Sequence, residues 1–141
     1  MLIKIVDDDQ VFVKKIKDIV YDNFKDIFLD YSIECITSNF EAQYFEKGDI
    51  FFLDIDLKEK NGIKIAEEIR ENNSNAIIIF VSAMNDMIFD SLIVQPFYFI
   101  RKDNFDRDMK IACTLIQKYI NKNHKIITFD FNGKKTAIQL S

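Results

Sequence analysis

Short apolar runs rich in Ile, Val and Phe alternate along the chain with segments whose apolar residues recur at helical spacing. Most of the runs lack regular polar positions, which is typical of strands buried on both faces of a parallel sheet. Five of them are predicted as strands, at residues 2–6, 32–37, 50–53, 76–81 and 97–100.

Helices are predicted between these strands. The clearest are two amphipathic stripes, one running from Val13 to Phe24 and one from Phe105 to Ile120. Strand and helix thus alternate five times, which favours an α/β fold with a doubly wound, flavodoxin-like parallel sheet of order 2-1-3-4-5. Ligands of such sheets bind beyond the carboxyl ends of the strands. Shorter helices are predicted at 39–46, 62–71 and 85–93.

The period of the pattern changes near the end of the chain. Apolar and polar residues alternate at 127–131 and at 136–140, and Asn132-Gly133 between them is a strong hairpin turn signal. An isolated hairpin is marginal in water, so this one either packs on the main domain or opens a second, truncated domain, which the abrupt end of the sequence favours. The predicted division is a main domain at 1–121 and a linker with a β-hairpin at 122–141.

Composition and charge narrow the function classes. With 141 residues, 48% of them hydrophobic, the chain can bury one core. A formal net charge of -4 offers no concentrated basic surface, so the main domain should not bind nucleic acid by itself. The sequence has no secretory signal and no apolar run near the ~20 residues that cross a bilayer, so we expect a cytoplasmic protein without a membrane partner.

Few residues are available for metal or nucleophile chemistry based on Cys and His. Cys35 and Cys113 lie in apolar sequence without CxxC spacing, which predicts free buried thiols. His124 is the sole histidine, which argues against zinc sites and Ser-His-Asp catalysis. Three glycines and no GxxxxGK[ST] motif exclude a P-loop ATPase.

The candidate chemistry gathers at the carboxyl ends of the predicted strands. In a 2-1-3-4-5 sheet the first and third strands flank the point where strand order reverses, so the residues that follow the strands should converge there. The set comprises Asp7, Asp8 and Asp9 after the first strand, Asp54 after the third, Ser82 after the fourth and Lys102 after the fifth.

Crowded carboxylates of this kind repel one another and raise at least one pKa unless a cation neutralises them. Mg²⁺, a hard cation with oxygen ligands, is the natural partner. A free carboxylate beside Mg²⁺ can attack phosphorus while Lys102 stabilises the charge on the equatorial oxygens, and the product is an aspartyl phosphate. Taken alone, an acidic triplet such as Asp7 to Asp9 is more often a solvated turn and helix N-cap than a functional site.

Together, IKIVDDD, IFFLDIDLKEKNG, IIIFVSA and FYFIRK resemble the motifs of a bacterial response-regulator receiver domain over about residues 2–120. The resemblance implies that Asp54 accepts a phosphoryl group from a sensor histidine kinase. It also implies that Asp7, Asp8 and Asp54 hold Mg²⁺ with help from the backbone carbonyl of Asp56. The protein would then be a signalling phosphoacceptor with only self-catalysed phosphorylation and dephosphorylation, not an enzyme.

The same resemblance assigns the switch. Ser82 would contact the phosphoryl group, Lys102 would pair with it, and Phe99 would change rotamer together with Ser82. Phosphorylation would then drive conformational change and homodimerisation.

Two departures from the family pattern bear on the output. Asp103 follows Lys102 where receivers commonly have proline, and LKEKNG lacks the usual loop proline. A lysine followed by an acid is familiar in receivers attached to LytTR-type DNA-binding domains, and KIITFDFNGKKTAIQLS is similar to the opening hairpin of such a domain. The resemblance therefore implies a transcription regulator that contacts DNA only through a missing C-terminal domain.

Two other functions compete with this interpretation. FLDIDL also fits the DxD nucleophile motif of haloacid dehalogenase-type phosphatases, although here an acidic cluster precedes the motif and no acidic pair follows Ser82 and Lys102. A receiver-like docking module that is never phosphorylated is the second alternative. Phosphoryl uptake from a small donor would separate these functions.

Overall fold

Five parallel strands form one sheet in a computed structural model that describes residues 1–26, 30–123, 125–131 and 134–140. The order is β2-β1-β3-β4-β5, which confirms the predicted fold class. The strands are β1 (Leu2–Val6), β2 (Ser32–Ile36), β3 (Ile50–Leu53), β4 (Ile77–Ser82) and β5 (Tyr98–Arg101).

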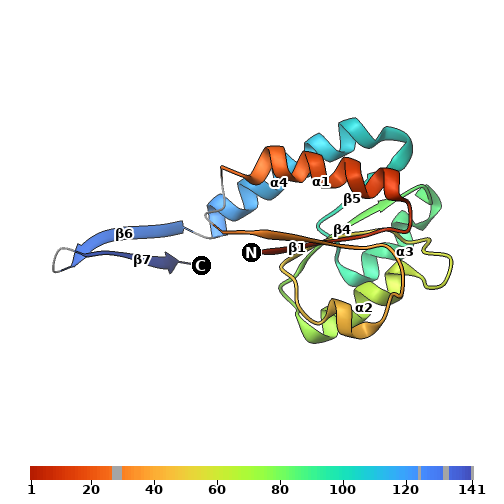
Figure 1. Cartoon of the computed structure of the whole chain (residues 1–141), viewed down its shortest axis with the longest axis horizontal. Helices are drawn as coiled ribbons and strands as arrows, with labels where there is room; N and C mark the ends of the chain where they lie inside the picture. The colour runs from red at the N-terminus through yellow and green to blue at the C-terminus, as the bar shows by residue number, and fades with distance from the viewer. Residues whose placement is uncertain (27–29, 124, 132–133, 141) are drawn as a thin grey trace.

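Helices cover both faces of this sheet, with α1 and α4 on one side and α2 and α3 on the other (Figure 1). The α-helices are α1 (Gln10–Phe24), α2 (Gly62–Asn72), α3 (Ile88–Ser91) and α4 (Phe105–Asn123). Short 3-10 helices lie between them: η1 (Ala42–Phe45), η2 (Asn85–Met87), η3 (Leu92–Val94) and η4 (Lys102–Asn104).

The central strand β3 shows why its sequence lacks polar alternation. Successive side chains of a strand point to opposite faces. Ile50 and Phe52 pack in the core beneath α1 and α4, while Phe51 and Leu53 pack in the core beneath α2, and none of the four is more than 1% exposed. Both faces of β3 are therefore buried, as predicted.

Strand register brings the carboxyl ends of the strands to a single edge. Val6 of β1 pairs with Leu53 of β3, so the residues that follow them, Asp7 and Asp54, emerge side by side. On the other side of β3, Leu53 pairs with Phe80 of β4, two residues before Ser82. The sheet therefore places the candidate residues of separate strands together.

Two predicted helices are wrong in extent. The segment 39–46 contains only η1, because Asn39 has a left-handed φ of 52° and the buried Phe40 and Phe45 are five positions apart, off helical spacing. The segment 85–93 is divided into η2, α3 and η3. The last of these helices ends at Val94, before Gln95, whose φ is 52°. Gln95 precedes Pro96, a position where right-handed helical geometry is disfavoured.

The prediction of two buried thiols is half correct. Cys113 lies on the buried face of α4, and this burial raises the pKa of its thiol to about 11. Cys35 is exposed, contrary to the prediction. It lies on β2, an edge strand that pairs only with β1 and is much less covered than the central strands.

The tail contains two strands outside the main sheet, β6 (Lys125–Phe131) and β7 (Lys134–Leu140), which pair antiparallel. They extend away from the end of α4 (Figure 1). The turn predicted at Asn132-Gly133 lies outside the described residues, as does His124, so the hairpin and the domain boundary at 121 stay predictions. Among the described residues, no helix has the length and apolar character that crossing a membrane requires.

Candidate functional site

Three carboxylates meet where β1 and β3 end. Oxygen atoms of Asp7, Asp8 and Asp54 lie within 4.8 Å of one another. Asp7 is 1% exposed and Asp54 is 4% exposed, while Asp8 is half-buried. Asp9 instead caps α1 by accepting a hydrogen bond from Val11 N at 2.9 Å. The N-cap interpretation of the acidic triplet is therefore correct for Asp9 alone.

Each buried carboxylate has one oxygen bound to the backbone and one directed toward Lys102. Asp7 Oδ1 accepts from Asp9 N at 2.9 Å, and Asp54 Oδ1 accepts from Ile55 N at 2.8 Å. The Lys102 ammonium lies 2.9 Å from Asp7 Oδ2 and 3.0 Å from Asp54 Oδ2. One ammonium is thus shared between two carboxylates.

Burial shifts the pKa values of the two carboxylates. It raises the pKa of Asp7 to about 6, with the charge of Asp54 adding to the effect, and it also raises the pKa of Asp54 despite the opposing influence of Lys102. Burial alone would lower the pKa of Lys102, but its close contact with the Asp7 carboxylate and the charge of Asp54 outweigh burial, so the pKa of Lys102 is raised. The site therefore holds more negative charge than a single lysine neutralises.

The carboxylate oxygens of the site fit the ligand preference of a divalent cation. Although Lys102 lies at ion-pair distance, no donor among the described residues reaches Asp7 Oδ2 in hydrogen-bond geometry, and this oxygen is buried. A buried carboxylate oxygen that accepts no hydrogen bond, beside two more carboxylates, gives the oxygen-rich environment that Mg²⁺ prefers. Asp7, Asp8 and Asp54 are the side chains that would hold it.

A cavity of about 310 Å³ opens above the acids and makes Asp54 accessible from solvent. Asp56 lies on its wall, and the Asp56 carboxylate accepts from Lys58 N at 3.2 Å. Lys58, with a left-handed φ of 62°, lies on the same wall. The cavity is lined by Asp8, Asp9, Asp54, Asp56, Lys58, Ala83, Met84 and Lys102.

Gly62 allows the loop after β3 to close tightly under the site. Its N–H donates to Ile55 O at 2.7 Å, and a Cβ at this position would collide with the backbone carbonyl of Asp54 and lie 2.8 Å from Ile55 Cα. The start of α2 therefore supports the backbone that carries Asp54.

Each of the two predicted switch residues has a contact outside the acidic cluster. Ser82 is fully buried, and its Oγ accepts from Met84 N at 3.1 Å, within its own loop. Phe99 is half-buried against Phe80, with ring centroids 6.1 Å apart. The Ser82 hydroxyl is also near enough to Asp54 to lower the pKa of that carboxyl, against the larger effect of burial.

Asp103, which stands where receivers commonly have proline, links two loops. Its carboxylate accepts from Asn85 Nδ2 at 3.2 and 3.4 Å, so the loop after β4 is tied to the turn after β5. One residue before Lys102, Arg101 forms an ion pair with the buried Asp108 at 2.8 Å. Sequence reasoning missed both contacts, because they depend on how α4 and the β4 loop lie beside the end of β5.

Comparisons with known proteins show the family to which the chain belongs. The family model "Response regulator receiver domain" matches residues 3–114, more than half of the chain. The chain belongs to the response regulator receiver family. Receivers are phosphoacceptors of two-component signalling and are not conventional enzymes.

Curated relatives of this receiver include two proteins named sensory transduction protein LytT. The one from Bacillus subtilis is 30% identical over 100 residues, which cover 71% of this chain and 40% of the relative. The one from Bacillus cereus is 26% identical over 141 residues, which cover 99% of this chain and 56% of the relative. The receiver chain thus spans about half the length of the curated relatives that it matches.

Solved structures share the fold. The signal receiver domain of a DNA-binding response regulator from Colwellia psychrerythraea matches with a TM-score of 0.70 at 17% identity, covering 86% of this chain and 98% of that one. The response regulator TrrA of Thermotoga maritima, in complex with Mg²⁺-BeF, matches with a TM-score of 0.58 at 25% identity, covering 81% and 97%.

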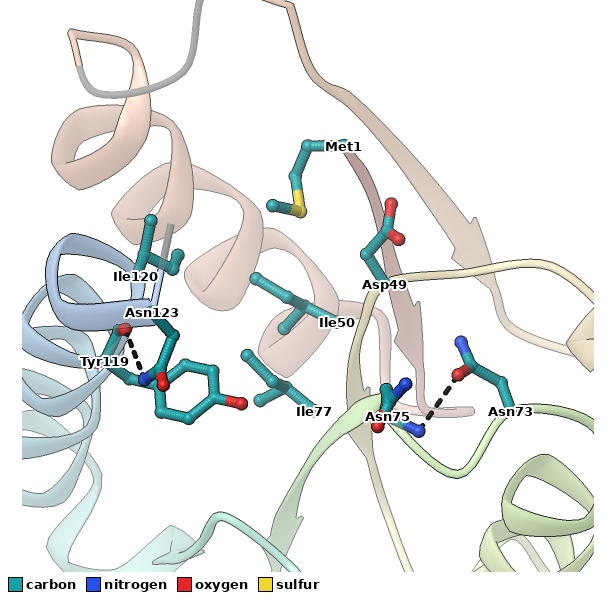
Figure 2. A pocket seen from close by; sticks show the side chains of 9 residues that line it. All are labelled: Met1, Asp49, Ile50, Asn73, Asn75, Ile77, Tyr119, Ile120 and Asn123. Atoms are coloured by element: carbon teal, nitrogen blue, oxygen red, sulfur yellow. Dashed lines mark hydrogen bonds between the residues drawn. The ribbon is translucent and has the colours of Figure 1, made fainter. Parts of the chain in front are cut away.

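A larger cavity, of about 430 Å³, lies at the opposite, amino-terminal edge of the receiver's sheet (Figure 2). Asn73, Asn75, Tyr119 and Asn123 surround an apolar floor, and Asp49 is the one carboxylate among its lining residues. That carboxylate already accepts from Leu2 N at 2.7 Å. The cavity therefore lacks the clustered charges of the acidic site and does not compete with it as the place of chemistry.

The raised pKa of Asp7 predicts that its ionisation lowers the stability of the fold in metal-free buffer. Between pH 4 and about 6 Asp7 binds its proton more tightly in the folded receiver than in the unfolded chain, so its contribution to the free energy of unfolding falls as pH rises through this range. Asp7→Asn should remove this loss. We expect the variant to exceed the parent by roughly 1–3 kcal/mol at pH 7.5 and to match it near pH 4 in urea unfolding.

Asp9→Asn is the matched control, since it makes the same charge change in the same segment but outside the ion-paired group. Its unfolding free energy should follow the parent's at every pH. A stability gain in Asp7→Asn of equal size at pH 4 and pH 7.5 would contradict the assignment of the cost to the buried charge.

Proposed function

We propose that this receiver accepts a phosphoryl group from a sensor histidine kinase on Asp54. The observation that carries the proposal is the position of Asp54 Oδ2. It belongs to a buried carboxylate on the wall of a solvent-open cavity, and Lys102 lies 3.0 Å from it. Such a carboxylate can attack phosphorus while the neighbouring ammonium stabilises the transferred group. The proposed donor places the reaction in the cytoplasm.

We assign the metal site to Asp7, Asp8 and Asp54, with the backbone carbonyl of Asp56 completing it from the cavity wall. Bound Mg²⁺ would supply charge neutralisation for the incoming phosphoryl oxygens. Because Asp7 and Asp54 are buried, their carboxylate oxygens are held in place before the phosphoryl donor arrives. Little reorganisation of the site is then needed at the moment of transfer.

The phosphoryl group would act as the switch through its charge. It adds about -1.5 to -2 charges and strong acceptor oxygens, which draw Lys102 away from its shared position and attract the Ser82 hydroxyl. Moving Ser82 requires that its bond to Met84 N be given up, so the loop after β4 shifts. Phe99, half-buried beside Phe80, would then turn further inward as the equilibrium between two conformations changes.

The loop after β4 leads directly to an apolar surface that suits the proposed output. Three side chains of α3 and η3 are strongly exposed: Phe89 at 81%, Ile93 at 75% and Leu92 at 55%. Exposed apolar groups of this size, gathered on one short segment, favour association with another surface. We propose that phosphorylation makes this surface, the α3 face, pair with a second copy.

We further propose that 122–141 opens a LytTR-type DNA-binding domain whose two copies the dimer would align for transcription control. Two observations support this. The family model stops at residue 114, and the alignment with the Bacillus cereus LytT protein extends over 99% of the chain and thus into the tail. The acidic main domain, with its net negative chain, would leave DNA contact to that C-terminal unit.

Intact-mass spectrometry after incubation with acetyl phosphate tests the phosphoacceptor. The parent should gain a single phosphoryl adduct that requires Mg²⁺, and Asp54→Asn should gain none. Asp56→Asn is the matched control, because the Asp56 side chain is exposed and outside the cluster of three, and it should still be modified. Normal adduct formation in Asp54→Asn would disprove the assignment, and no adduct under any condition would favour the docking module.

Light scattering after size exclusion tests the α3 face. The phosphorylated parent should elute as a dimer and phosphorylated Phe89→Ser as a monomer. Val11→Ser, which removes another strongly exposed apolar side chain, from α1 at 60% exposure, should dimerise like the parent. Dimerisation of phosphorylated Phe89→Ser at the parent's concentration dependence would remove this surface from the account.

A further inference from the structure

The Lys102 ammonium has a third neighbour besides the two carboxylates. The ring centroid of Phe12 lies 4.5 Å from Lys102 Nζ, which is within the range of a cation–π contact. Asp7 and Asp54 therefore contact the ammonium through their oxygens, while Phe12 contacts it through its ring. The Lys102 side chain is only 12% exposed, so little water competes for this position.

We propose that Phe12 is a positioning residue for Lys102, setting where the ammonium lies through contact with its aromatic ring. The inference rests on the proposed function in giving Lys102 a role in phosphoryl transfer. The contact itself is independent of that role, since it is a property of the unphosphorylated protein.

Phe12 is itself held in place by the elements that build the site. It lies in the first turn of α1, directly after the acidic segment that ends with the capping Asp9. Its ring packs edge-on against Phe105, with centroids 5.4 Å apart and an angle of 78°. Phe105 is 6% exposed and begins α4, immediately after the η4 turn that contains Lys102. The ring pair thus joins the segment of the acids to the segment of the lysine.

A ring contact suits a lysine that must change partners. The ion pair with Asp7 and the hydrogen bond to Asp54 hold the ammonium on the carboxylate oxygens, whereas attraction to an aromatic face depends much less on the direction of each N–H. Lys102 can therefore turn toward a phosphoryl group on Asp54 without leaving Phe12. Phe12 carries no charge and no metal ligand, so its loss should slow phosphoryl uptake without weakening Mg²⁺ binding.

Two substitutions of Phe12 distinguish the effect of its aromatic face from the effect of its apolar volume. Phe12→Leu keeps an apolar side chain but removes the aromatic face, and Phe12→Tyr retains the face. Phe97→Leu is the matched control, because it removes one ring of a second edge-on pair in the same core layer, Phe97 with Tyr119 at 5.5 Å, away from Lys102. Lys15→Ala removes the exposed second cation that lies 5.2 Å from the Phe12 ring.

The direct readout is the NMR shift of the Lys102 side-chain protons, which the ring current of Phe12 displaces. We expect this displacement to vanish in Phe12→Leu and to persist in Phe12→Tyr, Phe97→Leu and Lys15→Ala. With acetyl phosphate as donor, the maximal phosphorylation rate should fall about tenfold in Phe12→Leu alone, while the Mg²⁺ concentration for half-maximal rate stays unchanged.

Unchanged Lys102 shifts in Phe12→Leu would overturn the proposal, and so would an equal loss of rate in Phe97→Leu, which would assign the effect to packing. If the parent itself takes up no phosphoryl group, the proposed function fails. The shift comparison then still decides whether Phe12 positions Lys102.

Discussion

The sharing of one ammonium between Asp7 and Asp54 is the interaction on which the rest of the site depends. Two carboxylates this deeply buried repel each other, and Lys102 offsets only part of their charge. The parallel register of β1 and β3 forces the acids together, and Gly62 lets the supporting loop close beneath them. The result is a negatively charged site that gains stability when a cation arrives.

Side-chain contacts hold the loops around this site. One of them involves Asp103, which stands after Lys102 where receivers commonly have proline. Asn85 donates a hydrogen bond to Asp103, and the Arg101 guanidinium donates two to Asp108, at 2.8 and 3.0 Å. The first contact joins the loop that follows Ser82 to the turn that contains Lys102. In the proposed switch, this hydrogen bond would link a displacement of one loop to the other.

Sequence reasoning could predict the parts of this receiver that depend on local pattern. The strands and the acids at their ends follow from apolar runs and abrupt polar stops, and the sheet order follows from their alternation with helices. The short η1 and the divided 85–94 region could not be predicted, because left-handed Asn39 and Gln95 interrupt helices that composition favours. Cys35 was misplaced because an apolar run does not reveal which strand is at the edge. Phe12 was missed because it lies outside the predicted stripe from Val13 to Phe24 and nothing in the sequence links it to Lys102.

The most direct test of the central claim is a crystal structure of the receiver with Mg²⁺ and beryllofluoride, a mimic of the phosphoryl group. The account predicts beryllium on Asp54 Oδ2, Mg²⁺ against Asp7 and Asp8, and the Lys102 ammonium in contact with a fluorine atom. Beryllofluoride on another carboxylate, or Lys102 still bridging Asp7 and Asp54 as it does at 2.9 and 3.0 Å in the free protein, would contradict it.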